Sequence, residues 1–557
     1  MVRKIFNFFY KETNELHQAA FLLAVFSILS QLLAFGRDRA LAHFFGASSS
    51  LDVYYAAFRI PDFLFVTIAS IVSLSVLVPF IVEREQSGRE AVKSFIDDIF
   101  SFFSLLIIAI CIITFLVIPY LAPVLFKGFD ISEIGKLIFV SRILLLSPVL
   151  LGLSNLFGSL TQAYNRFLIY AFAPVLYNLG IIFGILFLSP QYGIAGVAMG
   201  VIAGSILHVG IQIPFVIKIG LMPRFKLFFN LASIKRVVAL SFPRTLTLST
   251  NHIATIFLIS LASLMTAGSI SVFTFAQNIS SVPLSIIGVS YSLAAFPTLS
   301  RHFSQNNIQA FVLQMATTVR HIIFWSLPIV ALFIVLRAQI VRVLLGTGRF
   351  DWNDTRLTAA ALAIFSLSVL AQSFLLLFVR AFYSAGHTKK PLLINVCSAI
   401  ILMLCAYGAV KLFYAWPAFS AFVAILLKVE DLPGTAVLML PLGFALGTIV
   451  NAVIHWLSFE KDFGRFPNET YRALFTSLAA AVFTGLGSFI GLNIFNQFDQ
   501  SRLWGIFTQG LLAGLLGIIF GIIVLKLLKS LELEEIWQTL HKKFWRADAV
   551  AENPEIV

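Results

Sequence analysis

The sequence predicts an all-α polytopic membrane protein. Only 12% of its 557 residues are charged and 59% are hydrophobic, whereas soluble domains carry about 25% charged residues. Apolar runs long enough to cross a bilayer recur along the whole chain. Lys and Arg gather in alternate connections between these runs, as the positive-inside rule describes. These observations leave no room for a large soluble domain.

Each predicted transmembrane helix is a separate apolar run bounded by loop residues. A helix of about 20 apolar residues crosses the hydrocarbon core, and about fourteen runs meet that length. The run 416–427 is too short to cross and precedes a Pro-Gly turn, so we predict a re-entrant or interfacial insertion there. The spans are predicted at 19–44, 51–82, 98–126, 134–163, 168–188, 192–217, 237–265, 268–299, 309–336, 358–386, 391–414, 436–459, 472–494 and 503–528.

The distribution of basic residues predicts the topology. We attribute the net charge of +13 to positive-inside loops and not to nucleic-acid binding, because the chain has no nucleic-acid motif and no basic low-complexity tail. Basic connections at 84–93, 218–236 and 461–472 alternate with connections at 190–193 and 266–269 that contain no Lys or Arg. With an even number of spans, this bias predicts that both termini are cytoplasmic.

Short motifs recur in the same order in the two halves of the chain. Phe-Lys-Gly-Phe-Asp at 126–130 precedes the fourth span, and Gly-Arg-Phe-Asp at 348–351 precedes the tenth, about 221 residues later. Each half holds an even number of spans, so the copies share one orientation, which is typical of transporters that bind substrate between two lobes. The predicted segments are an amphipathic cytoplasmic N-terminus at 1–18, an N-lobe at 19–220, a C-lobe at 221–460, two C-terminal spans at 461–530 and a cytoplasmic tail at 531–557.

Ionisable residues inside the first two spans are the first candidates for function. Such a residue costs about 2.5–3.5 kcal/mol at the bilayer centre, so it normally faces a protein interior or a watery cavity. Arg37 lies late in the first span. Asp52, Tyr55, Arg59 and Asp62 follow each other at helical spacing in the second span and share one face. A structural alternative is that Arg59 and Asp62 neutralise each other, or that Arg59 extends to the membrane interface.

Two further candidates lie in the second half. Arg244 follows Pro243 near the start of the seventh span, and a cytoplasmic anchor is the alternative role for this arginine. Asn278 lies in the eighth span, where an amide can hydrogen-bond across helices. A cavity edged by arginines suits an anionic head group, because guanidinium groups bind phosphate through two parallel hydrogen bonds.

Motifs for enzymatic chemistry are missing. The chain contains no Walker A sequence, no His-Glu-x-x-His, no nucleophile elbow and no paired catalytic carboxylates. Cys111, Cys397 and Cys405 lie in apolar runs without the spacing of a metal site. We therefore expect no enzyme activity, no cofactor and no metal centre.

Several segments resemble the MurJ (MviN) lipid II flippases of the multidrug/oligosaccharidyl-lipid/polysaccharide exporter superfamily. The strongest are Ser-Gln-Leu-Leu-Ala-Phe-Gly-Arg-Asp at 30–38, His-Phe-Phe-Gly-Ala at 43–47 and Leu-Asp-Val-Tyr-Tyr-Ala-Ala-Phe-Arg-Ile-Pro at 51–61. The resemblance extends over roughly residues 19 to 530. It implies two six-helix bundles plus two C-terminal helices, and the movement of lipid II, the undecaprenyl-pyrophosphate-linked peptidoglycan precursor, across the cytoplasmic membrane.

The resemblance also carries individual residues. Arg37 falls on a cavity arginine of the family's first helix, and Asp52 on the acidic residue that opens its second helix. Three family arginines are replaced here, by Gln31, Phe65 and Asn278, which removes much of the cationic site that the family implies.

Two other basic residues bear on this loss. Arg59 keeps a basic residue that the family often has, and Arg244 stands where the family tends to have a small residue, so we hypothesise that Arg244 compensates.

The prediction is therefore a lipid II flippase of the bacterial cytoplasmic membrane that works by alternating access. Its partners would be a polyprenyl-pyrophosphate-linked saccharide, membrane lipid and cell-wall synthesis proteins, with no nucleic acid. One alternative is a flippase of another polyprenyl-linked saccharide on the same fold. A second is a non-transporting membrane scaffold for cell-wall synthesis. The predicted substrate-binding residues are Arg37, Asp52, Arg59, Arg244 and Asn278.

Overall fold

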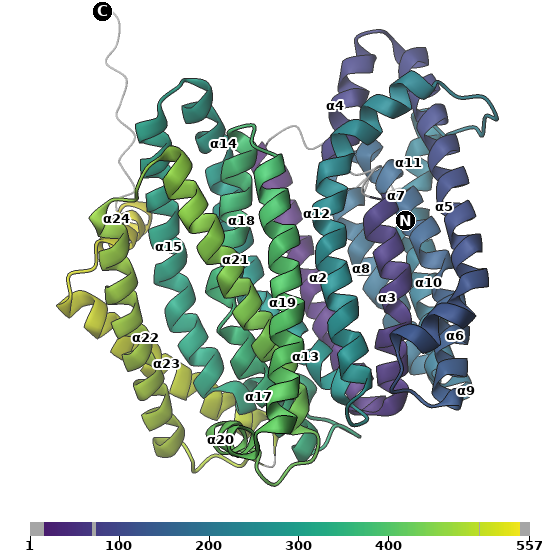
Figure 1. Cartoon of the computed structure of the whole chain (residues 1–557). Coiled ribbons are helices and arrows are strands. Elements are labelled where there is room, and N and C mark those ends of the chain that lie inside the picture. Colours follow the sequence, from purple (N-terminus) through teal and green to yellow (C-terminus); the bar gives the residue numbers. More distant parts are fainter. Residues whose placement is uncertain (1–15, 70–73, 501, 546–557) are drawn as a thin grey trace, which may run out of the picture. The chain divides into compact units, whose positions relative to one another are not determined.

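The structure is a computed structural model that describes residues 16–69, 74–500 and 502–545 (Figure 1). Within the helices, the side chains of residues 16–21, 74–76, 233, 243–244 and 539–545 also lie outside the described part. The described residues form helices and their connections, without a strand. The all-α prediction is therefore confirmed.

The chain forms two compact units. The first unit comprises Met1–Phe275, Leu344–Thr358 and Asn395–Gly443, and the second comprises Ala276–Val343, Ala359–Ile394 and Phe444–Val557. The predicted boundaries of the N-lobe and C-lobe stay a prediction. Helices α13, α16, α17, α19 and α21 run across the division between the units.

The elements follow one another along the chain without long irregular connections. The helices up to the second half of the chain are α2 (Leu16–Phe45), α3 (Ser49–Ala69), α4 (Leu74–Glu85), α5 (Arg89–Leu125), α6 (Ile131–Leu144), α7 (Leu146–Ala163), α8 (Phe167–Phe183), η1 (Gly184–Leu188), α9 (Ser189–Tyr192), α10 (Ile194–Gly210), α11 (Ile213–Lys218), α12 (Leu231–Ser263) and α13 (Ser269–Pro283). Those that follow are η2 (Leu284–Val289), α14 (Ser290–Ser304), α15 (Ile308–Val335), α16 (Arg337–Leu345), α17 (Trp352–Ser366), α18 (Val369–Ser384), α19 (Lys389–Ala415), α20 (Pro417–Leu427), η3 (Thr435–Leu438), α21 (Met439–Phe463), α22 (Asn468–Ile494), α23 (Leu503–Leu527) and α24 (Leu531–Trp545).

The predicted count of fourteen spans is not confirmed. By length and composition, eleven helices of the described residues can cross a membrane, or twelve if the pair α17 and α18, bent by 42°, forms one span. The two remaining predicted spans, at 19–44 and 51–82, fall on α2 and on α3 with α4. Both adjoin or contain residues outside the described part, and both carry the ionisable residues discussed above. The predicted insertion at 416–427 forms the short apolar helix α20.

In the first unit, α8 and α10 approach each other through glycines. A Cβ atom added to Gly200 would lie 2.5 Å from Cα of Gly184, and one added to Gly180 would lie even closer to Cα of Gly204. Without a hydrophobic driving force between helices in lipid, such small residues let the backbones pack closely. The five-residue π-helix η1 begins at Gly184, so the contact lies where α8 changes its winding.

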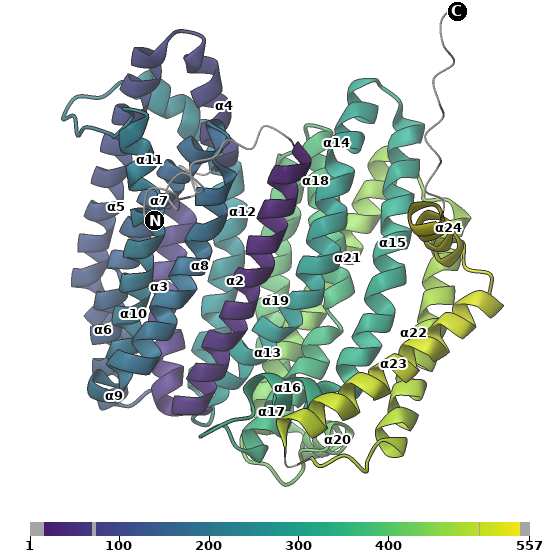
Figure 2. The ribbon, with the colours of Figure 1, turned by 180° about the vertical axis from the view of Figure 1, so that it is seen from behind.

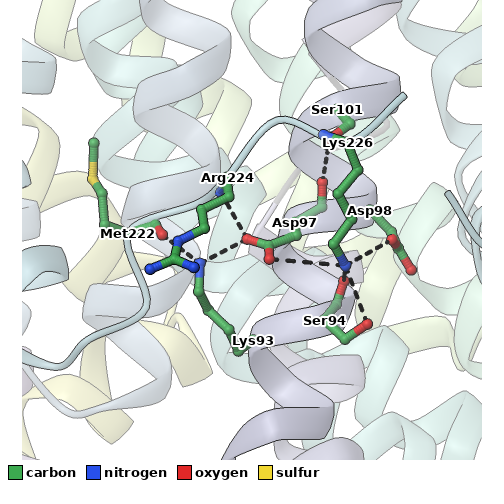
Figure 3. Close-up of polar contacts among 8 residues, drawn as sticks. All are labelled: Lys93, Ser94, Asp97, Asp98, Ser101, Met222, Arg224 and Lys226. Atoms are coloured by element: carbon green, nitrogen blue, oxygen red, sulfur yellow. Dashed lines mark hydrogen bonds and ion pairs between the residues drawn. The ribbon is translucent and has the colours of Figure 1, made fainter. Parts of the chain in front are cut away.

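A network of ion pairs fastens the connection between α11 and α12 to α5 (Figure 3). Asp97 and Asp98 on α5 are only 5% and 6% exposed. Asp97 pairs with Lys93 at 2.7 Å and accepts a hydrogen bond from the backbone N–H of Arg224 at 2.8 Å. Asp98 pairs with Lys226 at 3.3 Å. Part of the basic charge attributed above to the positive-inside rule therefore neutralises buried carboxylates of the same unit.

The glycine contact leads to a prediction about stability. We expect Gly200→Ala to lower the thermal unfolding temperature of the detergent-solubilised protein, because the added methyl group meets backbone atoms that cannot move aside; overpacking typically costs about 1–3 kcal/mol. Gly408→Ala is the matched control, since Gly408 is also inside a helix and a Cβ atom added there would meet no neighbouring element within 4 Å. Equal unfolding temperatures for the two variants would contradict the close contact.

Candidate functional site

Arg37 is held by side chains of α2 and α8, which pack against each other (Figure 2). Its Nε and terminal nitrogen donate to Asp38 Oδ1 at 2.9 and 2.8 Å, and the other terminal nitrogen donates to Asn178 Oδ1 at 3.4 Å. Asn178 in turn donates to Ser30 Oγ at 3.2 Å. The side chain of Arg37 keeps 23% exposure, while that of Asp38 keeps 6%. Arg37 and Ser30, predicted to share a face of the first helix, thus contact the same amide, and the positive charge of Arg37 is balanced by its neighbour in sequence.

Asp52 anchors the connection between α12 and α13. Its carboxylate is 3% exposed and accepts from the backbone N–H of Gly268 at 2.7 Å, and from the N–H and hydroxyl of Ser271 at 2.7 and 2.6 Å. A carboxylate at a helix N-terminus satisfies free N–H groups and is favoured by the helix dipole. In this structure the acceptor capacity of Asp52 is used by the protein itself, and its role as a substrate contact stays a prediction.

Arg59 is less fully bonded than Arg37. One terminal nitrogen donates to Thr274 Oγ1 at 3.3 Å. Its Nε is buried and has no hydrogen-bond partner among the described residues. Arg59 and Asp62, both described, make no ion pair within 4.0 Å, so the structural alternative of mutual neutralisation does not hold here; Asp62 instead lies 3.5 Å from Nδ1 of His252 on α12. A guanidinium group with an unused donor at membrane depth can accept an anion.

A cavity of about 300 Å³ lies next to this stretch of α3, entirely within the first unit. Its walls come from α3, α7, α8 and α10, and they mix polar side chains with apolar rings. The lining residues are Phe58, Pro61, Asp62, Phe65, Ser147, Leu151, Asn155, Pro174, Tyr177 and His208.

The structure brings together only some of the predicted site residues. Arg37, Asp52 and Arg59 belong to the first unit, and Asn278 is a half-buried residue of the second. The side chain of Arg244, which the hypothesis of compensation concerns, lies outside the described residues. In the described part of the chain, no group of three or more His, Cys, Asp or Glu side chains is placed to hold a metal ion.

Sequence reasoning missed several residues of the cavity. Ser147, Leu151 and Asn155 are spaced by four, which places them on one face of α7, and two polar residues at this spacing in an apolar run are a usable signal. Tyr177 and Asn178 follow Pro174 on α8, but nothing in the sequence connects them with Arg37, which lies 141 residues before Asn178.

The bonding of Asp52 predicts its effect on stability. We expect Asp52→Ala to lower the thermal unfolding temperature strongly, because three donors lose their acceptor and each unsatisfied buried group costs about 1–3 kcal/mol. Asp52→Asn, which keeps one acceptor oxygen, should give an intermediate value. If Asp52→Ala unfolds at the wild-type temperature, Asp52 is not the anchor of the connection between α12 and α13.

Comparisons with known proteins agree on one group of proteins. The model of the family described as lipid II flippase MurJ matches residues 41–508. A probable lipid II flippase MurJ of Buchnera aphidicola subsp. Schizaphis graminum is 27% identical over 388 residues, which is 69% of this chain and 75% of that protein. The lipid II flippase MurJ of Burkholderia cenocepacia is 23% identical over 489 residues, which is 86% of this chain and 90% of that protein.

Solved structures show the same fold. A lipid II flippase MurJ in an inward closed conformation matches with a TM-score of 0.72 and 22% identity, over 91% of this chain and 100% of the other. An inward-facing multidrug resistance transporter of the MATE family, from the MOP superfamily, matches with a TM-score of 0.61 and 14% identity, over 78% of this chain and 94% of the other. The predicted superfamily fold is therefore confirmed.

Proposed function

The chain belongs to the lipid II flippase MurJ family, and on that premise we propose that it moves lipid II across the bacterial cytoplasmic membrane by alternating access. The family and the many apolar helices make it a multi-pass protein of the bacterial inner membrane. The proposal includes cytoplasmic placement of both termini, which the alternation of basic connections favours. A flippase moves its substrate without a covalent step, so the lack of catalytic motifs fits this function.

The observation that carries the proposal is the incomplete bonding of Arg59. Arg37 is balanced by Asp38 at 2.8 Å, whereas Arg59 has one hydrogen bond of 3.3 Å and a buried Nε without a partner in the described part of the chain. A buried donor that stays unsatisfied is unfavourable unless a ligand uses it. The pyrophosphate of lipid II offers oxygens that a guanidinium group binds at two points. Arg59 is therefore the proposed first contact of the head group, and Arg37 a second one.

An apolar groove in the second unit suits the polyprenyl tail. It has a volume of about 480 Å³ and is lined by α18, α21 and α22. Its wall includes Leu370, Phe374, Trp456 and Leu474, with few polar atoms. Burying a hydrocarbon chain there gains about 25 cal/mol per Å² of apolar surface removed from water. We propose that this groove takes part of the tail, while membrane lipid and proteins that make or use the precursor are the other partners.

Replacement of Arg59 tests the proposal. We expect Arg59→Ala to abolish, and Arg59→Lys to reduce, the growth of a bacterial strain depleted of its own lipid II flippase, because lysine keeps the charge but loses the two-point geometry. Membrane expression is measured in parallel. Arg301→Ala is the matched control, since Arg301 is an exposed arginine on α14. Normal growth with well-expressed Arg59→Ala would refute a head-group role for Arg59.

A second candidate is a flippase for another polyprenyl-linked saccharide. The observation that favours it is Phe65, which lines the cavity where the resemblance implies an arginine. An apolar ring in place of a cation suits a head group with less negative charge. The same depletion strain separates the two: growth supported by the wild-type chain favours lipid II, and failure despite good membrane expression favours the second candidate.

A further inference from the structure

Asp62 and His252 form a contact of two ionisable side chains at membrane depth. Nδ1 of His252 on α12 lies 3.5 Å from Oδ2 of Asp62 on α3. About a third of each side chain is accessible, 32% for Asp62 and 30% for His252. Ionisable residues inside a membrane segment mark ion pathways or proton relays more often than structural positions. The head-group contacts proposed above do not use this pair.

The cavity gives this pair a path to water. Asp62 lines it together with Ser147, Asn155 and Tyr177, all of which carry polar atoms. A volume of about 300 Å³ has room for several water molecules, each of which occupies about 30 Å³ in the liquid, and polar walls give them partners. A proton can therefore travel between the cavity and the carboxylate along hydrogen-bonded water.

The other groups around Asp62 favour a proton over a metal cation. Arg59 lies one turn earlier on α3, and Tyr177 and His208 reach the cavity from α8 and α10. From α7 come only the uncharged Ser147 and Asn155. The fixed positive charge of Arg59 repels a bound metal ion, whereas an imidazole that faces a carboxylate is a ready proton acceptor near neutral pH.

We propose that Asp62 and His252 form a proton-binding site whose occupancy sets the contact between α3 and α12. The proton arrives through water in the cavity and rests on the imidazole of His252, which becomes an imidazolium facing the Asp62 carboxylate. A charge-assisted hydrogen bond is about 2.7–2.9 Å long, shorter than the present 3.5 Å. Loading the proton therefore draws the two helices together, and its release loosens them.

A second contact between the same helices offers a reporter. Thr67 Oγ1 on α3 and Ser249 Oγ on α12 are 3.0 Å apart. Cysteines at both positions, in the full-length protein with its three native cysteines replaced by serine, measure the approach of the helices as a disulfide cross-linking rate in nanodiscs. Thiol chemistry itself depends on pH, so the rate is divided by the rate of the same pair in an Asp62→Asn background.

We expect this ratio to rise several-fold between about pH 8 and about pH 5.5, the range in which histidine takes up a proton. An Asp462→Asn background is the matched control and should follow the wild type, because Asp462 pairs with Lys390 at 2.6 Å in the other unit. A ratio that stays flat overturns the proton site. Titration of His252 by histidine-selective NMR, assigned with His252→Gln, provides a second readout that needs no cysteines and must show the same midpoint.

Coupling of this proton to lipid movement rests on the proposed function, whereas proton binding does not. In proteoliposomes, an imposed proton gradient should change the rate of lipid II movement by the wild type and leave the rate of Asp62→Asn unchanged. If the cross-linking ratio responds to pH but no variant moves lipid, the proposed function fails and the proton site stands. If only a sodium gradient changes the rate, through Asp62, the site binds a metal cation and the proton assignment is wrong.

Discussion

An ionised side chain inside a membrane has to be compensated by the protein, and the first compact unit is arranged around this requirement. Arg37 is balanced by Asp38, and the carboxylate of Asp52 accepts three hydrogen bonds from the start of α13. Asp62 faces His252, while Arg59 keeps an unused buried donor. The degree of compensation thus separates residues that hold the fold together from residues that remain able to bind a ligand.

Most of these side chains project from α3, which explains why one helix carries both structural and functional positions. Near its start, Asp52 fixes the connection between α12 and α13. Farther along, Arg59, Asp62 and Phe65 lie beside or line the cavity. The helices that complete the cavity wall include α8 and α10, whose glycines allow backbone contact. Close packing on one side of the cavity and charge on the other give a rigid pocket with a polar wall, which is what recognition of an anionic head group needs.

Hydropathy was sufficient to predict the all-α class and the approximate positions of the helices, because the bilayer imposes the length of every span. The helical stripe from Asp52 to Asp62 was also evident from spacing alone. The partners of these residues were not, since Asp52 is bonded to backbone groups 216 and 219 residues away and His252 meets Asp62 only through packing. The π-helices η1 and η2 likewise have no periodic signature that distinguishes them from the α-helices they continue.

The central claim is that Arg59 is left incompletely bonded in order to bind the pyrophosphate of a lipid-linked precursor. The most direct measurement compares the affinities of the purified protein, in nanodiscs, for undecaprenyl pyrophosphate and for undecaprenol, which share the tail and differ in the anionic group. The account predicts tighter binding of the pyrophosphate, with a preference that disappears in Arg59→Ala. Equal affinities for the two lipids in the wild-type protein would contradict it.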